Sequence, residues 1–322
     1  MGVKGARSDK IRDSASDDTL MITGSAGFLG RHLCKSLSHD GRVTVALYHH
    51  RLPESLPHIY PVCSDLSSAE LLGAPLRGVS TVIHLAWEHN FVGTPTLQQD
   101  MASGQITSNL IILKNLITAM EQSGTRRLIF ISAIGASRHS TNPFLREKYI
   151  AEFMVMNSRI PEKIVMRSAL VCGGHDQFVK SIMNVMKVPK IYPVPRIKSK
   201  LAPLHVSDMV GIVRGLVTEK MVDSTALLEI EGSESYRVDD IFKMVSERYA
   251  KGSRLPIKGF IGATLVPFFE RNSRTKTQGP RLRHFLALSS QADKGTWSDL
   301  HLLKVVPKKF AGFEGAMSDN YP

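Results

Sequence analysis

Cysteine is scarce in this chain of 322 residues, and Cys34, Cys63 and Cys172 form no CxxC pair. Such spacing excludes a disulfide framework and a zinc-finger site. The 12 histidines show no HExxH or comparable spacing, so the sequence predicts no metal site. So few cysteines fit a reducing compartment, either the cytosol or the mitochondrial matrix.

Long apolar runs are also missing from the chain. No segment comes near the roughly 20 apolar residues that a membrane-spanning helix needs, so we expect no transmembrane segment. The hydrophobic fraction of 43% and the charged fraction of 22% are typical of a globular protein. The length suits one large α/β domain, alone or with a smaller lobe.

Acidic residues are outnumbered by basic ones, and the formal net charge is +12. This excess favours anionic partners: nucleotide phosphates, acidic lipids, acidic protein surfaces or nucleic acid. Residues 251–284 hold eight lysines and arginines against one acid, Glu270, around the apolar run GFIGATLVPFF. We predict contact of 251–284 with acidic phospholipid, with an ordinary solvated basic face as the alternative. Nucleic acid is not expected, because no recognised motif accompanies the charge.

The first 18 residues are polar and lack the apolar core of a secretory signal. Their lysines and arginines resemble a mitochondrial transit segment, but four aspartates oppose that interpretation, because transit segments are poor in acids. We expect residues 1–18 to be a flexible or partner-bound tail.

From residue 19 to 175, short apolar runs alternate with longer amphipathic ones, which predicts βαβ units and a doubly wound parallel sheet of the Rossmann type. Residues 176–322 are expected to form a smaller basic C-terminal lobe, partly interleaved with the Rossmann domain. Proline-rich 187–203 is predicted to be an exposed loop or edge region. Strands are expected at 19–23, 43–48, 60–64, 79–86, 127–132 and 163–168, and helices at 101–122 and 237–250.

The strongest local motif is TGSAGFLG, which places Gly24, Gly27 and Gly30 between the first expected strand and a helix. Glycines at this spacing let backbone N–H groups approach a pyrophosphate at the helix N-terminus. The motif predicts dinucleotide binding, with a structural turn as the alternative.

The end of the second expected strand, ALYHHRLPES, distinguishes the two nicotinamide dinucleotides. An acid there bonds the ribose of NAD, whereas a cation accommodates the 2′-phosphate of NADP. The acid is missing, and Arg51 lies beside His49 and His50. We therefore favour NADP(H) over NAD(H), with a solvated Arg51 as the alternative.

Several motifs in order resemble the extended branch of the short-chain dehydrogenase/reductase superfamily. They are TGSAGFLG, SDLS at 64–67, HLAW at 84–87, the helix and strand NLIILKNLITAMEQSGTRRLIFIS, and MRSALVCGG. The resemblance implies an extended Rossmann fold with a bound nicotinamide nucleotide. The cofactor-binding residues that it and the glycine loop predict are Gly24, Ala26, Gly27, Phe28, Leu29, Gly30, His49, Arg51, Asp65, Leu66, Leu85, Ala86, Asn109, Ser132 and Lys148.

Within that branch the chain is similar to a family of nucleotide-binding accessory subunits of mitochondrial respiratory complex I, through FLREK at 144–148, the stretch 178–216 and the basic C-terminal part. That resemblance implies tightly bound NADPH without turnover, and a peripheral place on the matrix side of the inner membrane. Two alternatives are an active NADP-dependent reductase or epimerase, and a nucleotide-binding assembly or regulatory factor of another complex. A cytoplasmic location remains the alternative.

The catalytic motif of the superfamily is altered in this chain. In family enzymes a tyrosine four residues before the lysine exchanges a proton with the substrate, and here that position is Phe144 before Lys148. Ser132 ends the fifth expected strand, but the usual serine position two residues on is Ile134, and Ser137 or Ser140 would have to substitute. We predict a degenerate site in which Lys148 holds a ribose. His205 and Asp208 are expected to be structural.

Overall fold

The computed structural model describes residues 19–87, 107–174, 176–186, 191–195, 200–218, 225–249 and 255–259, together with 313, 315 and 316. The tail 1–18 and all of the basic segment 251–284 except 255–259 lie outside these residues. The predictions for both segments therefore stay predictions.

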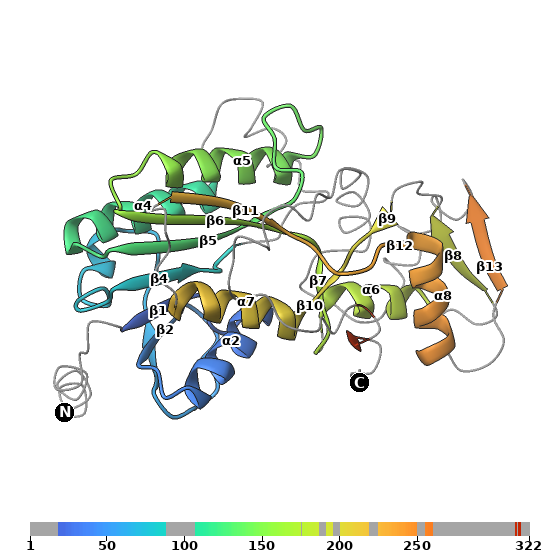
Figure 1. Ribbon diagram of the computed structural model, residues 1–322, viewed down its shortest axis with the longest axis horizontal. Coiled ribbons are helices and arrows are strands. Elements are labelled where there is room, and N and C mark those ends of the chain that lie inside the picture. Colours follow the sequence, from blue (N-terminus) through green and yellow to red (C-terminus); the bar gives the residue numbers. More distant parts are fainter. Residues whose placement is uncertain are drawn as a thin grey trace.

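A seven-stranded parallel sheet forms the centre of the molecule, with strand order β11-β6-β5-β4-β1-β2-β3 (Figure 1). This order extends the 3-2-1-4-5-6 arrangement of a doubly wound sheet, so the predicted fold class is confirmed. The strands are β1 Leu20–Thr23, β2 Thr44–Tyr48, β3 Ile59–Cys63, β4 Thr81–His84, β5 Arg127–Ala133, β6 Glu162–Ser168 and β11 Thr225–Ile230.

Helices cover both faces of the sheet, as the near-continuous apolar character of its strands requires (Figure 1). On one face lie α2 (Phe28–His39) and α7 (Val206–Thr218), and on the other α4 (Ser108–Ser123) and α5 (Pro143–Met156). A short 3₁₀ helix, η1, spans Glu70–Leu72. Both α7 and β11 come from beyond residue 175, so the later part of the chain completes the Rossmann layers.

Local signals set the ends of the helices beside the crevice. Thr107 caps α4 by accepting a hydrogen bond from the Leu110 N–H, and Gly124 ends the helix in the left-handed conformation. Asn142 caps α5 and is followed by Pro143 at the first helical position, where a missing N–H costs nothing.

A smaller core lies at one end of the sheet. It is built on α6 (Gln177–Val185) and α8 (Val238–Tyr249), with Phe178, Phe242 and Phe313 fully buried between them. Short strand pairs border it: β7 Val171–Cys172 with β10 Leu204–His205, β9 Lys200–Leu201 with β12 Tyr236–Arg237, and β8 Ile191–Pro195 with β13 Leu255–Gly259.

The proline-rich segment 187–203, predicted to be a loop or edge region, contributes the edge strand β8, which forms a parallel pair with β13. Proline is tolerated on the free edge of such a strand. The helix expected at 101–122 is described from Ser108. The helix expected at 237–250 is confirmed as α8. Across the described residues, none of the helices has the length and apolarity to span a bilayer.

Candidate nucleotide-binding site

The glycine loop between β1 and α2 is packed too closely for any other residue at two positions. Gly24 has φ 69°, and a Cβ there would lie 2.7 Å from the Ala86 nitrogen. A Cβ on Gly30 would lie 2.4 Å from the Gly24 oxygen. The loop therefore rests directly on the turn after β4, and the structure brings together two predicted site residues, Gly24 and Ala86.

The N-terminus of α2 faces the crevice without a capping side chain. Gly27 is its N-cap, and Ala26 beside it is half-buried. Phe28 and Leu29 pack their side chains onto the core, so the first turn presents backbone N–H groups. Uncapped N–H groups and the positive end of the helix dipole form a phosphate site.

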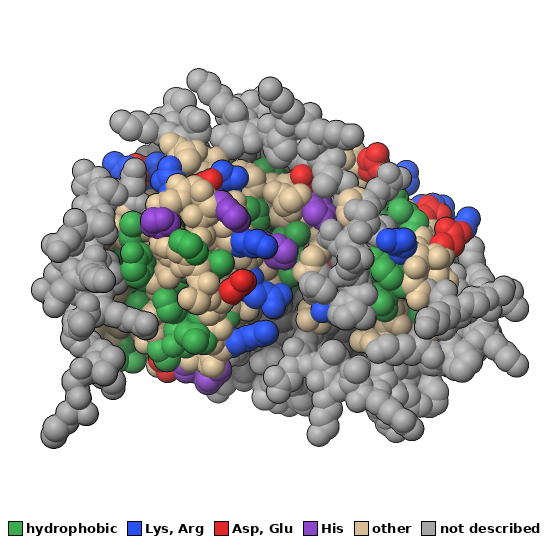
Figure 2. Space-filling view, turned by 90° about the horizontal axis from the view of Figure 1, so that it is seen from below, with side chains coloured by type: hydrophobic (Ala, Val, Ile, Leu, Met, Phe, Trp, Pro, Cys, Tyr) green, Lys and Arg blue, Asp and Glu red, His purple; other side chains and the backbone are tan. Residues whose placement is uncertain are grey.

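Two basic side chains, Arg31 and Lys180, lie near this helix end. Burial lowers the pKa of Lys180 on α6, the Asp176 carboxylate raises it, and the Arg31 guanidinium lowers it, so Arg31 of α2 lies close to this lysine. Figure 2, seen from the side of α2 and α7, shows Lys, Arg and His side chains gathered near the middle of that face. This positive charge favours an anionic ligand at the loop.

Thr23, which the motif contains but the site prediction omitted, fastens β1 to the turn after β4. Its Oγ1 lies 2.8 Å from Nδ1 of His84 and accepts from the N–H groups of Leu85 and Ala86 at 3.2 and 3.3 Å. The Thr23 hydroxyl thus holds in place the turn after β4, against which the glycine loop packs.

The end of β2 carries the residues predicted to select the nucleotide. His49, His50 and Arg51 are exposed, and the two imidazoles lie with ring centroids 3.7 Å apart and their planes tilted by 35°. Asp65 accepts a hydrogen bond from the Ser67 N–H. Hydrogen bonding by the Ser67 side chain, followed by this backbone bond and the nearby imidazoles, lowers the pKa of the Asp65 carboxyl.

Asn115 of α4 fixes the loop that follows β3. Its side-chain amide donates to the carbonyl oxygens of Leu66 and Ser67 at 3.1 and 2.6 Å. Leu66 itself packs against the core under α4. Asn115 was missed by sequence reasoning because only the tertiary contact between α4 and this loop reveals its role.

Lys148 is enclosed by aromatic rings beside β5. Its Nζ lies 3.6 Å from the centre of the Trp87 ring, 4.8 Å from that of Phe130 and 5.7 Å from that of Phe144. The same nitrogen donates to the Ile131 carbonyl oxygen at 2.9 Å, and the residue is only 5% exposed. We call Lys148 with these three rings the aromatic box.

Burial controls the titration of this region. Desolvation lowers the pKa of Lys148 to about 7, although the Glu147 and Glu152 carboxylates raise it. The imidazole of His84, stacked on Phe130 at 6.0 Å, has its pKa lowered to about 3 by burial and by the charge of Lys148. His84 is therefore neutral at physiological pH.

The carboxylate of Glu147 joins α5 to α4. Glu147 is fully buried and accepts from Thr107 Oγ1 and from the Asn109 amide. Burial raises the pKa of Glu147, and these hydrogen bonds lower it. The contacts described for Asn109 thus hold α4 against α5, and its predicted contact with a nucleotide stays a prediction.

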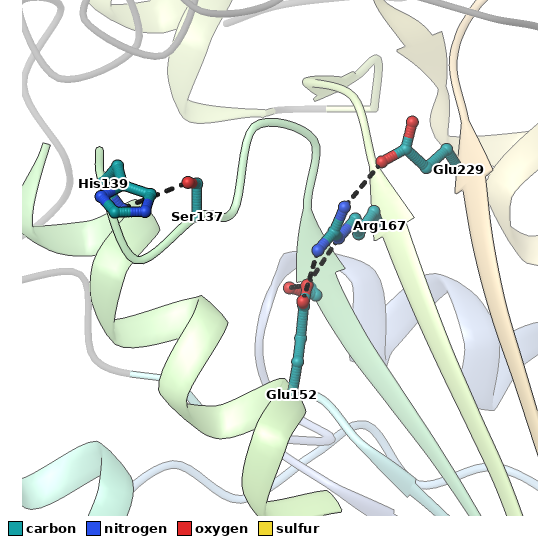
Figure 3. Close-up of polar contacts among 6 residues, drawn as sticks. Ser137, His139, Glu152, Arg167 and Glu229 are labelled. Atoms are coloured by element: carbon teal, nitrogen blue, oxygen red, sulfur yellow. Dashed lines mark hydrogen bonds and ion pairs between the residues drawn. The ribbon is translucent and has the colours of Figure 1, made fainter. Parts of the chain in front are cut away.

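The Ser132 hydroxyl is hydrogen-bonded into an ion-pair network. Its Oγ donates to Glu152 at 2.5 Å, and Arg167 binds the same carboxylate through Nε at 2.9 Å and Nη2 at 2.7 Å. Figure 3 shows Arg167 between Glu152 of α5 and Glu229 of β11, which it contacts at 2.9 Å. The network joins α5, β6 and β11 through the carboxylate that Ser132 of β5 contacts.

The other hydroxyl groups near α5 have local partners. Ser137 Oγ accepts from the His139 N–H (Figure 3), and Ser140 Oγ accepts from the Asn142 N–H. Phe144 is 5% exposed and contributes a ring with no dissociable proton. Tyr149 is half-buried one position past Lys148, about 100° around the helix.

The described residues contain no group of three or more His, Cys, Asp or Glu side chains that could hold a metal ion. His205 and Asp208 are buried where β10 leads into α7, and the His205 Nδ1 lies 2.6 Å from Ser207 Oγ.

Known proteins resemble the chain in the same region. A family model described as NAD(P)H-binding matches residues 24–171. NADH dehydrogenase (ubiquinone) 1 alpha subcomplex subunit 9, mitochondrial, of Arabidopsis thaliana is 25% identical over 255 residues, which is 74% of this chain and 61% of that protein. The Mus musculus protein of the same name is 25% identical over 66% of this chain and 57% of its own length. The chain thus spans about three fifths of these curated relatives.

Among solved structures, a nucleoside-diphosphate-sugar epimerase from Staphylococcus aureus superposes with a TM-score of 0.69 at 15% identity. The superposition covers 92% of this chain and 99% of the epimerase, and at this identity it shows the fold alone. Together with the glycine loop and the strand order, these matches show that the chain has a Rossmann fold like that of nucleotide-sugar epimerases, and that its residues 24–171 resemble an NAD(P)H-binding family.

Proposed function

We propose that this protein is a non-catalytic NADP(H)-binding accessory subunit of mitochondrial NADH:ubiquinone oxidoreductase, on the matrix side of the inner membrane. The observation that carries the loss of catalysis is Phe144, whose buried ring lies 5.7 Å from Lys148 Nζ where a phenol is needed. General acid catalysis requires a proton at that position, and a benzene ring carries none.

The hydroxyl of Ser132 supports the same conclusion. It donates to Glu152, which Arg167 also holds, so orienting a substrate carbonyl would require breaking a charge-assisted hydrogen bond in a buried network. The two relatives named as complex I subunits support the choice of assembly.

The preference for NADP(H) rests on the exposed Arg51 that follows β2. No acid stands at 49–51, and the Arg51 guanidinium is free to meet a 2′-phosphate bidentately. Arg51→Ala should weaken NADPH binding about tenfold, equivalent to about 1.4 kcal/mol, and leave NADH binding unchanged. Equal losses for both nucleotides, measured by titration calorimetry, would remove the basis for this preference.

Two experiments test the proposal as a whole. The purified full chain should bind NADPH but show no NADPH oxidation with carbonyl compounds or sugar nucleotides. Affinity purification from native mitochondrial membranes should recover complex I subunits with the chain. Turnover that is lost in Lys148→Ala, or co-purification with an unrelated complex, would contradict it.

For the basic segment 251–284 we propose contact with the acidic lipid surface near the complex, each cation contributing about 1 kcal/mol. Liposomes containing phosphatidylserine should sediment the chain, and reversing the charge of the segment's lysines and arginines should abolish this. Sedimentation that is unchanged after reversal would leave an ordinary solvated face.

An active reductase or epimerase is the second candidate, favoured by the superposition on a sugar epimerase and by the presence of Lys148. The turnover assay above separates the two candidates, because only this one predicts oxidation of NADPH.

A further inference from the structure

The aromatic box lies where the second nucleoside of a dinucleotide belongs. A doubly wound sheet has two mononucleotide-binding halves, and the pyrophosphate crosses between them at the first glycine loop. Trp87 follows β4 directly, and Phe130 and Ile131 belong to the carboxyl-terminal half of β5. The box therefore closes the β4–β5 side, while the loop and β2 serve the adenosine side.

The box leaves the Lys148 nitrogen few free directions. The Trp87 ring faces it at 3.6 Å, and the Ile131 carbonyl holds it at 2.9 Å from the sheet. Aromatic faces within about 6 Å attract an ammonium group, so both Trp87 and Phe130 stabilise this position.

The rings are themselves supported from the strands. Trp87 and Phe130 have centroids 5.8 Å apart, and Phe130 stacks on His84, whose Nδ1 meets Thr23. Trp87 is half-buried, whereas Phe130 and Lys148 are buried.

We infer that this site recognises its nucleotide through the 2′-phosphoadenosine and pyrophosphate groups, while its own aromatic box occupies the place of the nicotinamide nucleoside. The inference rests on the proposed NADP(H) site. It has two consequences: the ligand class is 2′-phosphorylated adenosine nucleotides, and the site does not distinguish the oxidised from the reduced nicotinamide.

Titration calorimetry of the purified full chain with NADPH, NADP⁺, adenosine 2′,5′-bisphosphate and nicotinamide mononucleotide tests this. The first three ligands should bind with dissociation constants within about threefold of one another, a difference of under about 1 kcal/mol. Nicotinamide mononucleotide should not compete. NADPH binding about 30-fold or more tighter than the bisphosphate, or than NADP⁺, would overturn the inference and leave the proposed function intact. Failure of all four to bind would overturn both.

Trp87 provides the matched variants. Trp87→Ala should open the box and strengthen NADP⁺ binding about tenfold relative to the bisphosphate, whereas Trp87→Phe, which keeps an aromatic face, should not. Equal affinities for both ligands in a folded Trp87→Ala protein would contradict the role given to the ring. Should that variant not fold, the wild-type ligand series still decides the inference.

Discussion

Around β1–β3 the crevice presents backbone N–H groups and exposed cations, whereas around β4–β6 it is lined with aromatic rings and closed ion pairs. Gly27 and Arg51 represent the first half, and Trp87 and Arg167 the second. The difference teaches that the two halves of one Rossmann sheet can carry different surroundings: an open glycine loop with exposed basic groups on one side, and packed rings and ion pairs on the other. Each variant below tests one half against the other.

The largest effect on nucleotide binding is expected at the glycine loop, where Gly24→Ala should abolish it. The added Cβ meets the Ala86 backbone at 2.7 Å and is also strained at φ 69°. We expect at least about a 100-fold loss in affinity, about 2.7 kcal/mol. Gly41→Ala is the matched control, since φ there is 68° with no atom within 4 Å. It should cost only the backbone strain of about 1–2 kcal/mol, and equal losses of binding in both variants would show that the contact with Ala86 is unimportant.

Arg167→Met should destabilise the ion-pair network around β4–β6 and leave the glycine loop and β2 unchanged. It leaves the Glu152 carboxylate buried at 6% exposure, together with the partly buried Glu229, without their cation. Removing one partner of a buried ion pair costs about 3–5 kcal/mol of unfolding free energy. Urea denaturation should show this loss, and the folded variant should bind NADPH normally. The double variant Arg167→Met/Glu152→Leu should recover part of the stability, and its failure to do so would contradict this account.

The same contrast explains what sequence reasoning found. The strands and the glycine loop were predictable because periodicity and TGSAGFLG are local signals that the fold does not override. The aromatic box was not, because it joins Trp87, Phe130 and Lys148 from three separate elements. The presence of Phe144 in the sequence predicted that the proton donor is missing. No spacing in the sequence predicted that Ser132 would bind Glu152. The features expected to bind phosphate lie in one continuous loop and can be read from the sequence. The packing around β4–β6 depends on tertiary contacts and cannot.

A pH titration sharpens the comparison through Lys148. Its pKa is lowered from an ordinary value near 10.5 to about 7, mainly by burial. Between these values the unfolded chain holds a proton that the folded protein has lost, so stability should rise with pH above about 7, by up to about 1.4 kcal/mol per unit. Lys148→Met should remove this rise in urea midpoints measured from pH 7 to 9. Equal slopes in both proteins would mean that Lys148 does not titrate in this range.

The smallest effect is expected from Phe144→Tyr, although it restores the missing phenol. A hydroxyl at this position gains a proton to donate, but the Lys148 nitrogen stays bonded to Ile131 and the Ser132 hydroxyl stays with Glu152. Tuning a phenol from a pKa of about 10 requires a free cation beside it, and positioning a carbonyl requires a free hydroxyl. NADPH oxidation by Phe144→Tyr should therefore remain at the level of Phe153→Tyr, an exposed position on the same helix. Turnover in Phe144→Tyr alone would show that the closed half is a single substitution away from an enzyme. If Phe144→Tyr does not oxidise NADPH but the double variant Phe144→Tyr/Trp87→Ala does, the aromatic box would instead be identified as the barrier to catalysis.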